Sequence, residues 1–296
     1  MSQSVAPGQA ALFILAGMAA LGLTDNFVVL VSDQSSLWQF HFLRGLMVLA
    51  AMVVVAMLGY GVLRPKRPLA VIARSAIQAT SMLIYFGCLA ILPIGVVVAG
   101  LFTAPLFVAL IAMVFQGKRL ARVHMIAIGL GFLGALMVIR PDPANLEWVA
   151  FLPILAGLLY AIGAVATRAW CEGEPTLGLS AGFFLLITIM GAIGCLLLPS
   201  EGSGAAGFAT RGWMPLDGKL LFWLAVQAVG AFIGIMCLFR GYQIGEASHV
   251  AVFEYSLLVF ASAWAWYLWG QTVTPLGLFG MALIVISGAV IAMKKV

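Results

Sequence analysis

The chain has 296 residues, of which 64% are hydrophobic and only 8% are charged, and its mean hydropathy is +1.15. A soluble domain of this length carries roughly 25% charged residues, which it needs to cover its surface. The composition therefore excludes a soluble globular protein and indicates that lipid surrounds most of the chain. The formal charge of +5 is dispersed over connecting segments, which excludes a nucleic-acid partner.

Ten apolar runs, each about long enough to cross a ~30 Å hydrocarbon layer, fill almost the whole sequence. The runs are continuous and do not alternate with a period of two, which favours helices over a membrane β-barrel. The sequence therefore predicts an all-α polytopic membrane protein with spans at 9–31, 37–58, 70–90, 94–115, 122–140, 147–170, 177–198, 219–239, 248–269 and 274–293.

The placement of basic residues predicts the orientation. If the N-terminus is cytoplasmic, eleven basic residues fall at cytoplasmic ends: Arg64, Lys66, Arg67, Arg74, Lys118, Arg119, Arg122, Arg168, Arg240, Lys294 and Lys295. Only Arg140, Arg211 and Lys219 fall at the opposite ends. Because basic residues accumulate on the cytoplasmic side of membrane proteins, both termini are predicted to be cytoplasmic.

Two segments of the chain are alike at an offset of about 152–154 residues. Residues 87–140 and 241–294 each contain a bend, an apolar helix, a turn with glycine and a glycine-rich last helix. We therefore expect two five-helix repeats, residues 1–145 and 146–296. An odd number of spans in each repeat inverts one against the other, and such inverted repeats are typical of secondary transporters, which bind their ligand between the halves.

The chain resembles the drug/metabolite transporter superfamily, specifically its EamA-like family of ten-helix transporters. The residues that carry the resemblance are Gly22, Asn26, Phe27, Phe42-Leu43-Arg44, Ala104-Pro105, Gly117, Gly129, Gly131, Gly134, Glu246-Ala247-Ser248, Phe253-Glu254-Tyr255 and Gly288-Ala289. The chain departs from the family pattern at Lys118 and Gln271, where an acid is usual, and at Leu257, where a proline is usual. The resemblance implies a transporter of a small metabolite in the inner membrane of a bacterium.

Asp25 is an acidic residue inside the first apolar run, between Thr24 and Asn26. A charged group at the centre of a membrane helix costs about 2.5–3.5 kcal/mol on insertion scales, so it is retained where it is paired, hydrated or useful. We interpret Asp25, with Asn26, as part of a cavity that binds a substrate. The alternative is that the first helix ends early and that Asp25 caps it at the interface.

Glu254 lies near the centre of the ninth run, beside Tyr255, at the position that Phe102 occupies in the other repeat. A carboxyl group there can bind a substrate or load and release a proton, and Glu254 is the candidate for proton coupling. The alternative is a salt bridge from Glu254 to a buried arginine.

Other polar residues in the apolar runs are weaker candidates for the same site. Arg44 and His41 share one helix face, and Arg44 is predicted either to pair with Asp25 or to extend to the outer interface. The remaining candidates are Gln78, Tyr85 and Gln227, whose side chains also join helices by hydrogen bonds in many membrane proteins. Pro93, Pro105 and Pro153 are predicted to kink helices.

These residues predict a secondary transporter that works by alternating access. Two acids with nearby aromatic residues favour a cationic or zwitterionic substrate, such as an amino acid or a methylated ammonium or sulfonium compound. The sequence has no P-loop, nucleophile elbow or metal motif, so neither an enzyme nor a cofactor is predicted. An integral-membrane enzyme acting on lipids and a structural subunit without a solute path are the alternatives, and a homodimer is left open.

Overall fold

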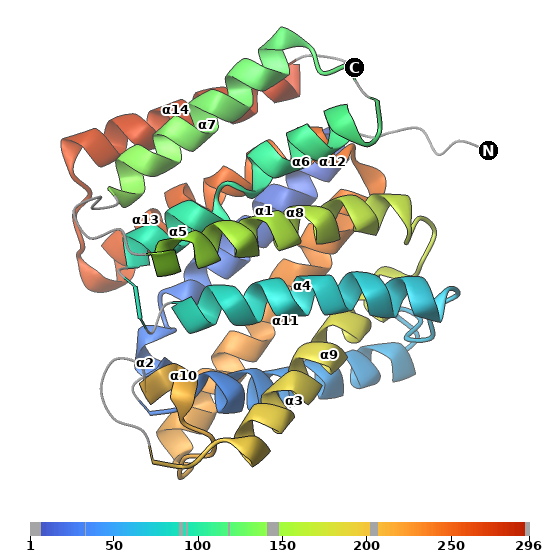
Figure 1. The fold of residues 1–296 in the computed structure, drawn as a ribbon, viewed down its shortest axis with the longest axis vertical. Helices are drawn as coiled ribbons and strands as arrows, with labels where there is room; N and C mark the ends of the chain where they lie inside the picture. The colour runs from blue at the N-terminus through green and yellow to red at the C-terminus, as the bar shows by residue number, and fades with distance from the viewer. Residues whose placement is uncertain are drawn as a thin grey trace.

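The computed structural model describes residues 7–32, 34–88, 91–92, 94–117, 119–140, 148–201 and 207–293. Within these ranges the secondary structure is helical, and the long helices lie side by side in one bundle (Figure 1). Pro93, Lys118, Lys294 and Lys295, which the sequence singled out, lie outside the described residues.

The helices of the first half are α1 (Pro7–Asp25), α2 (Val29–Ser32), α3 (Leu37–Met57), α4 (Pro68–Cys88), α5 (Ile94–Leu101), α6 (Ala104–Val114) and α7 (Arg122–Ile139). Those of the second half are η2 (Trp148–Phe151), α8 (Leu152–Ala169), α9 (Thr176–Leu197), α10 (Gly207–Thr210), α11 (Gly218–Ile244), α12 (Ala247–Val250), η3 (Ala251–Tyr255), α13 (Ser256–Trp269) and α14 (Pro275–Met293).

Ten segments of the described residues are long and apolar enough to cross a membrane. They match the ten predicted runs, and most of their ends lie within a few residues of the predicted ends. The eighth span is longer than predicted, because it continues to Ile244 instead of ending at residue 239. The predicted class, an all-α polytopic membrane protein, is confirmed.

The main helix pairs join one half of the chain to the other. α1 packs on α11, α4 on α8, α3 on α9 and α7 on α14 (Figure 1). The α1–α11 contact is close at two small residues: a Cβ atom on Gly17 would stand 2.9 Å from the carbonyl oxygen of Gly234. Small residues that bring backbones together are the usual means of helix association in lipid.

The first span ends earlier than predicted. α1 stops at Asp25, whereas the sequence analysis expected a helix to residue 31; a turn follows and then the short α2. The backbone N–H of Phe27 bonds to the carbonyl of Thr24, a three-residue spacing that tightens the last turn. The amide of Asn26 donates to the carbonyl of Gly22 at 2.7 Å and to that of Ala261 at 3.1 Å, which fixes this helix end to α13.

The fourth and ninth spans are discontinuous. The fourth divides into α5 and α6 at Phe102 and Thr103, directly before Pro105, whose ring cannot continue the hydrogen-bond ladder. The ninth consists of α12, the 3-10 segment η3 and α13. Glu254 and Tyr255 lie in η3. Broken membrane helices of this kind expose backbone at the depth where transporters bind their substrates.

Candidate functional site: a cavity between the two halves

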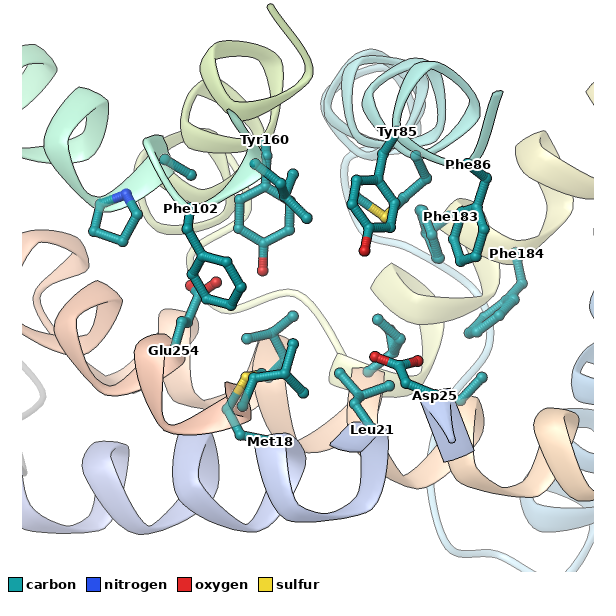
Figure 2. Close-up of a pocket in the computed structure, with 18 of the residues that line it drawn as sticks. Met18, Leu21, Asp25, Tyr85, Phe86, Phe102, Tyr160, Phe183, Phe184 and Glu254 are labelled. Carbon is teal, nitrogen blue, oxygen red and sulfur yellow. The ribbon is translucent and has the colours of Figure 1, made fainter. Parts of the chain in front are cut away.

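A cavity of about 130 Å³ lies between helices of both halves. Its charged and hydroxylated lining residues are Asp25, Arg44, Tyr85, Tyr160 and Glu254; Figure 2 labels all of these except Arg44. The rest of the wall is apolar and aromatic, formed by Met18, Leu21, Met82, Phe86, Leu101, Phe102, Ala104, Pro105, Phe183, Phe184, Ala231, Ile235, Leu238 and Leu257. A mostly apolar wall with a few converging polar groups is typical of a site for a small molecule.

Asp25 and Arg44 lie at one end of the cavity. Asp25 is exposed and Arg44 is buried, and both side chains line the cavity. The guanidinium of Arg44 lies 4.3 Å from the ring centroid of Phe40 and donates from Nη2 to Nδ1 of His41 at 3.3 Å. The hydroxyl of Tyr85 points into the same end (Figure 2).

Glu254 lies at the other end of the cavity (Figure 2) and is 8% exposed. Its carboxylate accepts hydrogen bonds from the hydroxyls of Tyr242, on α11, and Tyr160, on α8. Phenol hydroxyls, rather than the buried arginine considered above, are therefore its hydrogen-bond partners. The two donors hold the carboxyl group in place at the cavity wall.

Tyr255 is fully buried behind Glu254. Its ring stacks on that of Phe102 with 5.7 Å between the centroids and an interplanar angle of 25°, and it is absent from the cavity wall. On the other side the ring meets α7 so closely that a Cβ atom on Gly131 would stand 2.5 Å from Cδ2 of Tyr255. Tyr255 therefore supports the segment that carries Glu254.

Three further candidates, Asn26, Gln78 and Gln227, lie outside the cavity wall. Asn26 holds the end of α1, as described above, and Gln227 donates from Nε2 to the carbonyl of Thr24 in the same turn. Gln78 is buried against α8, where a Cβ atom on Gly163 would stand 2.1 Å from its Oε1. The structure thus brings four of the eight predicted residues together: Asp25, Arg44, Tyr85 and Glu254.

Sequence reasoning missed Tyr160 and Tyr242 as partners of Glu254. Tyrosine is common at membrane interfaces, so its presence in a span carries little information on its own. The useful signal was depth: Tyr160 lies near the middle of the sixth span, where a hydroxyl needs a hydrogen-bond partner. The lining phenylalanines carried no signal, because they are indistinguishable from packing residues in sequence.

At the end of the bundle remote from Asp25, hydrogen bonds join three segments. We call the residues that make them the closing network: Lys66, Arg67, Arg168, Glu174, Thr176 and Gln243. Carboxylate oxygens of Glu174 accept the backbone N–H groups of Lys66 and Arg67 at 2.7 and 2.8 Å. Gln243 donates to the carbonyl of Glu174 at 2.9 Å, and its own side-chain and backbone oxygens accept from Thr176 and Arg168. These bonds join the α3–α4 connection, the α8–α9 connection and the end of α11.

A family model for EamA-like transporters matches this chain twice, at residues 8–140 and 147–293. The two matches together cover nearly the whole sequence and meet close to residue 145, the predicted repeat boundary. The chain belongs to the EamA-like transporter family. This membership makes the protein a membrane transporter of small metabolites and removes the lipid-modifying enzyme and the structural subunit from consideration.

Curated relatives of this EamA-like transporter carry different substrates. The riboflavin transporter of Rhizobium johnstonii is 26% identical over 247 residues, which cover 80% of this chain and 76% of the relative. The pseudopaline exporter of Pseudomonas aeruginosa is 26% identical over 226 residues, covering 76% and 75%. A solved crystal structure covers 96% of both chains with a TM-score of 0.76 at 19% identity, which shows the fold alone.

Proposed function

We propose that this protein is a secondary transporter for a small metabolite with a cationic nitrogen, either a cation or a zwitterion, and that the cavity is its binding site. The observation that carries the proposal is the pair of acids, Asp25 and Glu254, at opposite ends of one aromatic-walled cavity. Aromatic faces and carboxylates are the groups that bind ammonium ions in proteins. The names of the relatives support transport of a small metabolite. The substrate class is inferred from the residues that line the cavity.

The size of the cavity supports a small substrate. A cavity needs a volume of about 10–15 Å³ to hold one water molecule. A cavity of about 130 Å³ therefore has space for roughly ten waters, or for a molecule of roughly ten non-hydrogen atoms. Arg44 next to Asp25 also supplies a partner for an anionic group, and this combination favours a zwitterion of amino-acid size. A methylated ammonium or sulfonium compound is of similar size.

Alternating access is supported by the helix pairing. If residues 1–145 and 146–296 are inverted repeats, α1 corresponds to α8 and α4 to α11, and the pairs α1–α11 and α8–α4 are equivalent. Both pairs are present, as is a broken helix in each half. Asp25, at one end of the cavity, is exposed, and the closing network joins three segments at the opposite end of the bundle; we take this arrangement as one end state of such a transporter, open at the Asp25 end.

The orientation in the membrane is part of the proposal. The closing network gathers Lys66, Arg67 and Arg168 at one end of the bundle, and basic residues favour the cytoplasmic side. We place this end in the cytoplasm of a bacterium, with both termini on that side of the inner membrane. The cavity then opens to the outside.

Glu254 is proposed as the residue that couples transport to protons. It is buried, it is held by phenol hydroxyls, and it contacts the same cavity as the substrate. A proton and a substrate ammonium group would therefore compete for one carboxylate, and such competition is sufficient for exchange of the two across the membrane.

The test uses matched ligand sets on purified protein in detergent. Leucine and phenylalanine are compared with isopentylamine and phenethylamine, which lack the carboxylate, and with 4-methylpentanoate and 3-phenylpropionate, which lack the amine; choline and glycine betaine form a further pair. We expect compounds with a cationic nitrogen to raise the melting temperature of the wild type and to lose this effect in Glu254→Gln. Stabilisation by the deaminated acids alone, or by no member of the sets, contradicts the proposal.

A further inference from the structure

Arg74 is a buried cation outside the cavity wall. It lies on α4, is 1% exposed, and donates from Nε to Oγ1 of Thr167 at 2.8 Å. Its guanidinium carbon lies 3.7 Å from the ring centroid of Phe239. The buried Nη1 group has no hydrogen-bond partner among the described residues, so part of the donor capacity of this guanidinium is unused.

The location of Arg74 connects the cavity with the closing network. Its partners Thr167, on α8, and Phe239, on α11, lie along their helices between the cavity-lining residues Tyr160 and Leu238 and the closing-network residues Arg168 and Gln243. It is less than two turns from the start of α4, where the backbone of Arg67 bonds to Glu174. Arg74 therefore lies between the cavity and the closing network.

The cost of burying its charge favours a ligand for Arg74. Burying an ionised side chain is costly unless it is paired and fully hydrogen-bonded, and the partners of Arg74 are a hydroxyl and a phenylalanine ring. Arginine is also the side chain best suited to bind a carboxylate, through parallel N–H groups. A leucine or methionine would fill the same space without this cost, so simple packing does not explain an arginine here.

We propose that Arg74 binds the anionic group of the substrate when the cavity opens towards the closing network, as Arg44 does when it opens at the Asp25 end. This inference rests on the proposed function and sharpens it, because the substrate then carries a carboxylate as well as a cationic nitrogen. Arg44 lies about two turns from the start of α3, and Arg74 lies less than two turns from the start of α4. The two arginines would bind the same anionic group one after the other, at opposite ends of the bundle.

The first test measures transport in proteoliposomes with the matched sets. In Arg74→Gln we expect uptake of the amino acid that the wild type transports to fall at least tenfold, with less than a twofold change for its decarboxylated amine. Arg74→Lys retains the charge and should recover part of the loss, and Arg240→Gln, an exposed arginine near the same end of the bundle, serves as the control. An equal loss for both compounds, or no loss, would overturn the role proposed for Arg74.

The second test needs no transported substrate. In a variant with Cys88, Cys195 and Cys237 replaced by serine, Cys171 is the remaining thiol, and it reports on the charge of Arg74. An anionic methanethiosulfonate should modify Cys171 faster than a cationic one, and Arg74→Gln should lower this ratio about tenfold through the lost Coulomb attraction. A ratio that does not change rejects Arg74 as an anion site, whether or not the matched sets identify a substrate.

Discussion

The rings of Phe102 and Tyr255 stack on each other at the two places where membrane helices are interrupted. Phe102 directly follows α5 and Tyr255 ends η3, so the breaks of the fourth and ninth spans meet at this stacked pair. Phe102 also faces the cavity, while Glu254, next to Tyr255, faces it from the other side (Figure 2). The stacked pair therefore fixes the two irregular segments between which the substrate is proposed to bind.

The contact of Tyr255 with α7 gives a prediction with a matched control. Gly131→Ala places a methyl group against the Tyr255 ring, and overpacking of this kind costs about 1–3 kcal/mol. Thermal unfolding in detergent should show a melting temperature lowered by several degrees, together with reduced transport. Gly129→Ala lies two residues away with open space around its Cβ position and should leave both unchanged; equal effects of the two variants would contradict the packing role.

Replacement of Glu254 by glutamine should separate folding from transport. The amide oxygen of glutamine still accepts the hydrogen bonds of Tyr160 and Tyr242, so the melting temperature should stay close to that of the wild type. The negative charge is lost, so uptake of the ligand into proteoliposomes should fall at least tenfold. Glu201→Gln, at an exposed acid in a connecting segment, is the control. Wild-type uptake by Glu254→Gln would remove this carboxylate from the mechanism.

Gln227 is predicted to matter for stability and not for selectivity. Gln227→Leu removes the hydrogen bond to the Thr24 carbonyl, and such bonds between membrane helices contribute about 1 kcal/mol. The melting temperature should fall by a few degrees, while the relative uptake of the matched ligands stays as in the wild type. A change in ligand preference would restore Gln227 to the binding site.

The thiol of Cys171 gives a prediction of pH dependence. Burial raises the pKa of this thiol above its ordinary value, and only the thiolate reacts with disulfide-forming reagents. The modification rate should therefore be slow at neutral pH and still rise with pH beyond the ordinary pKa of a cysteine. Glu174→Gln weakens the closing network and removes a nearby negative charge, so it should accelerate the reaction at every pH. A rate that levels off near neutral pH would contradict the buried position.

The sequence was sufficient to predict the class and the spans, because in lipid the length and continuity of apolar runs determine helices. That Asp25 and Glu254 would line a cavity was also predictable, since charged groups inside membrane spans are costly and rare; their role in transport stays a prediction. Helix interruptions were harder to predict: Asn26 ends α1 through a contact with Ala261, a residue 235 positions away in the sequence. The surroundings of Arg74 were likewise not predictable, because Thr167 and Phe239 come into contact with it only in the folded bundle.

Uptake of the identified ligand into proteoliposomes, with and without an imposed pH gradient, tests the central claim most directly. We expect the gradient to increase accumulation by the wild type and to have no effect on Glu254→Gln, whose residual uptake only equilibrates the ligand. Wild-type uptake that is the same with and without the gradient would contradict the coupling of protons to substrate at Glu254.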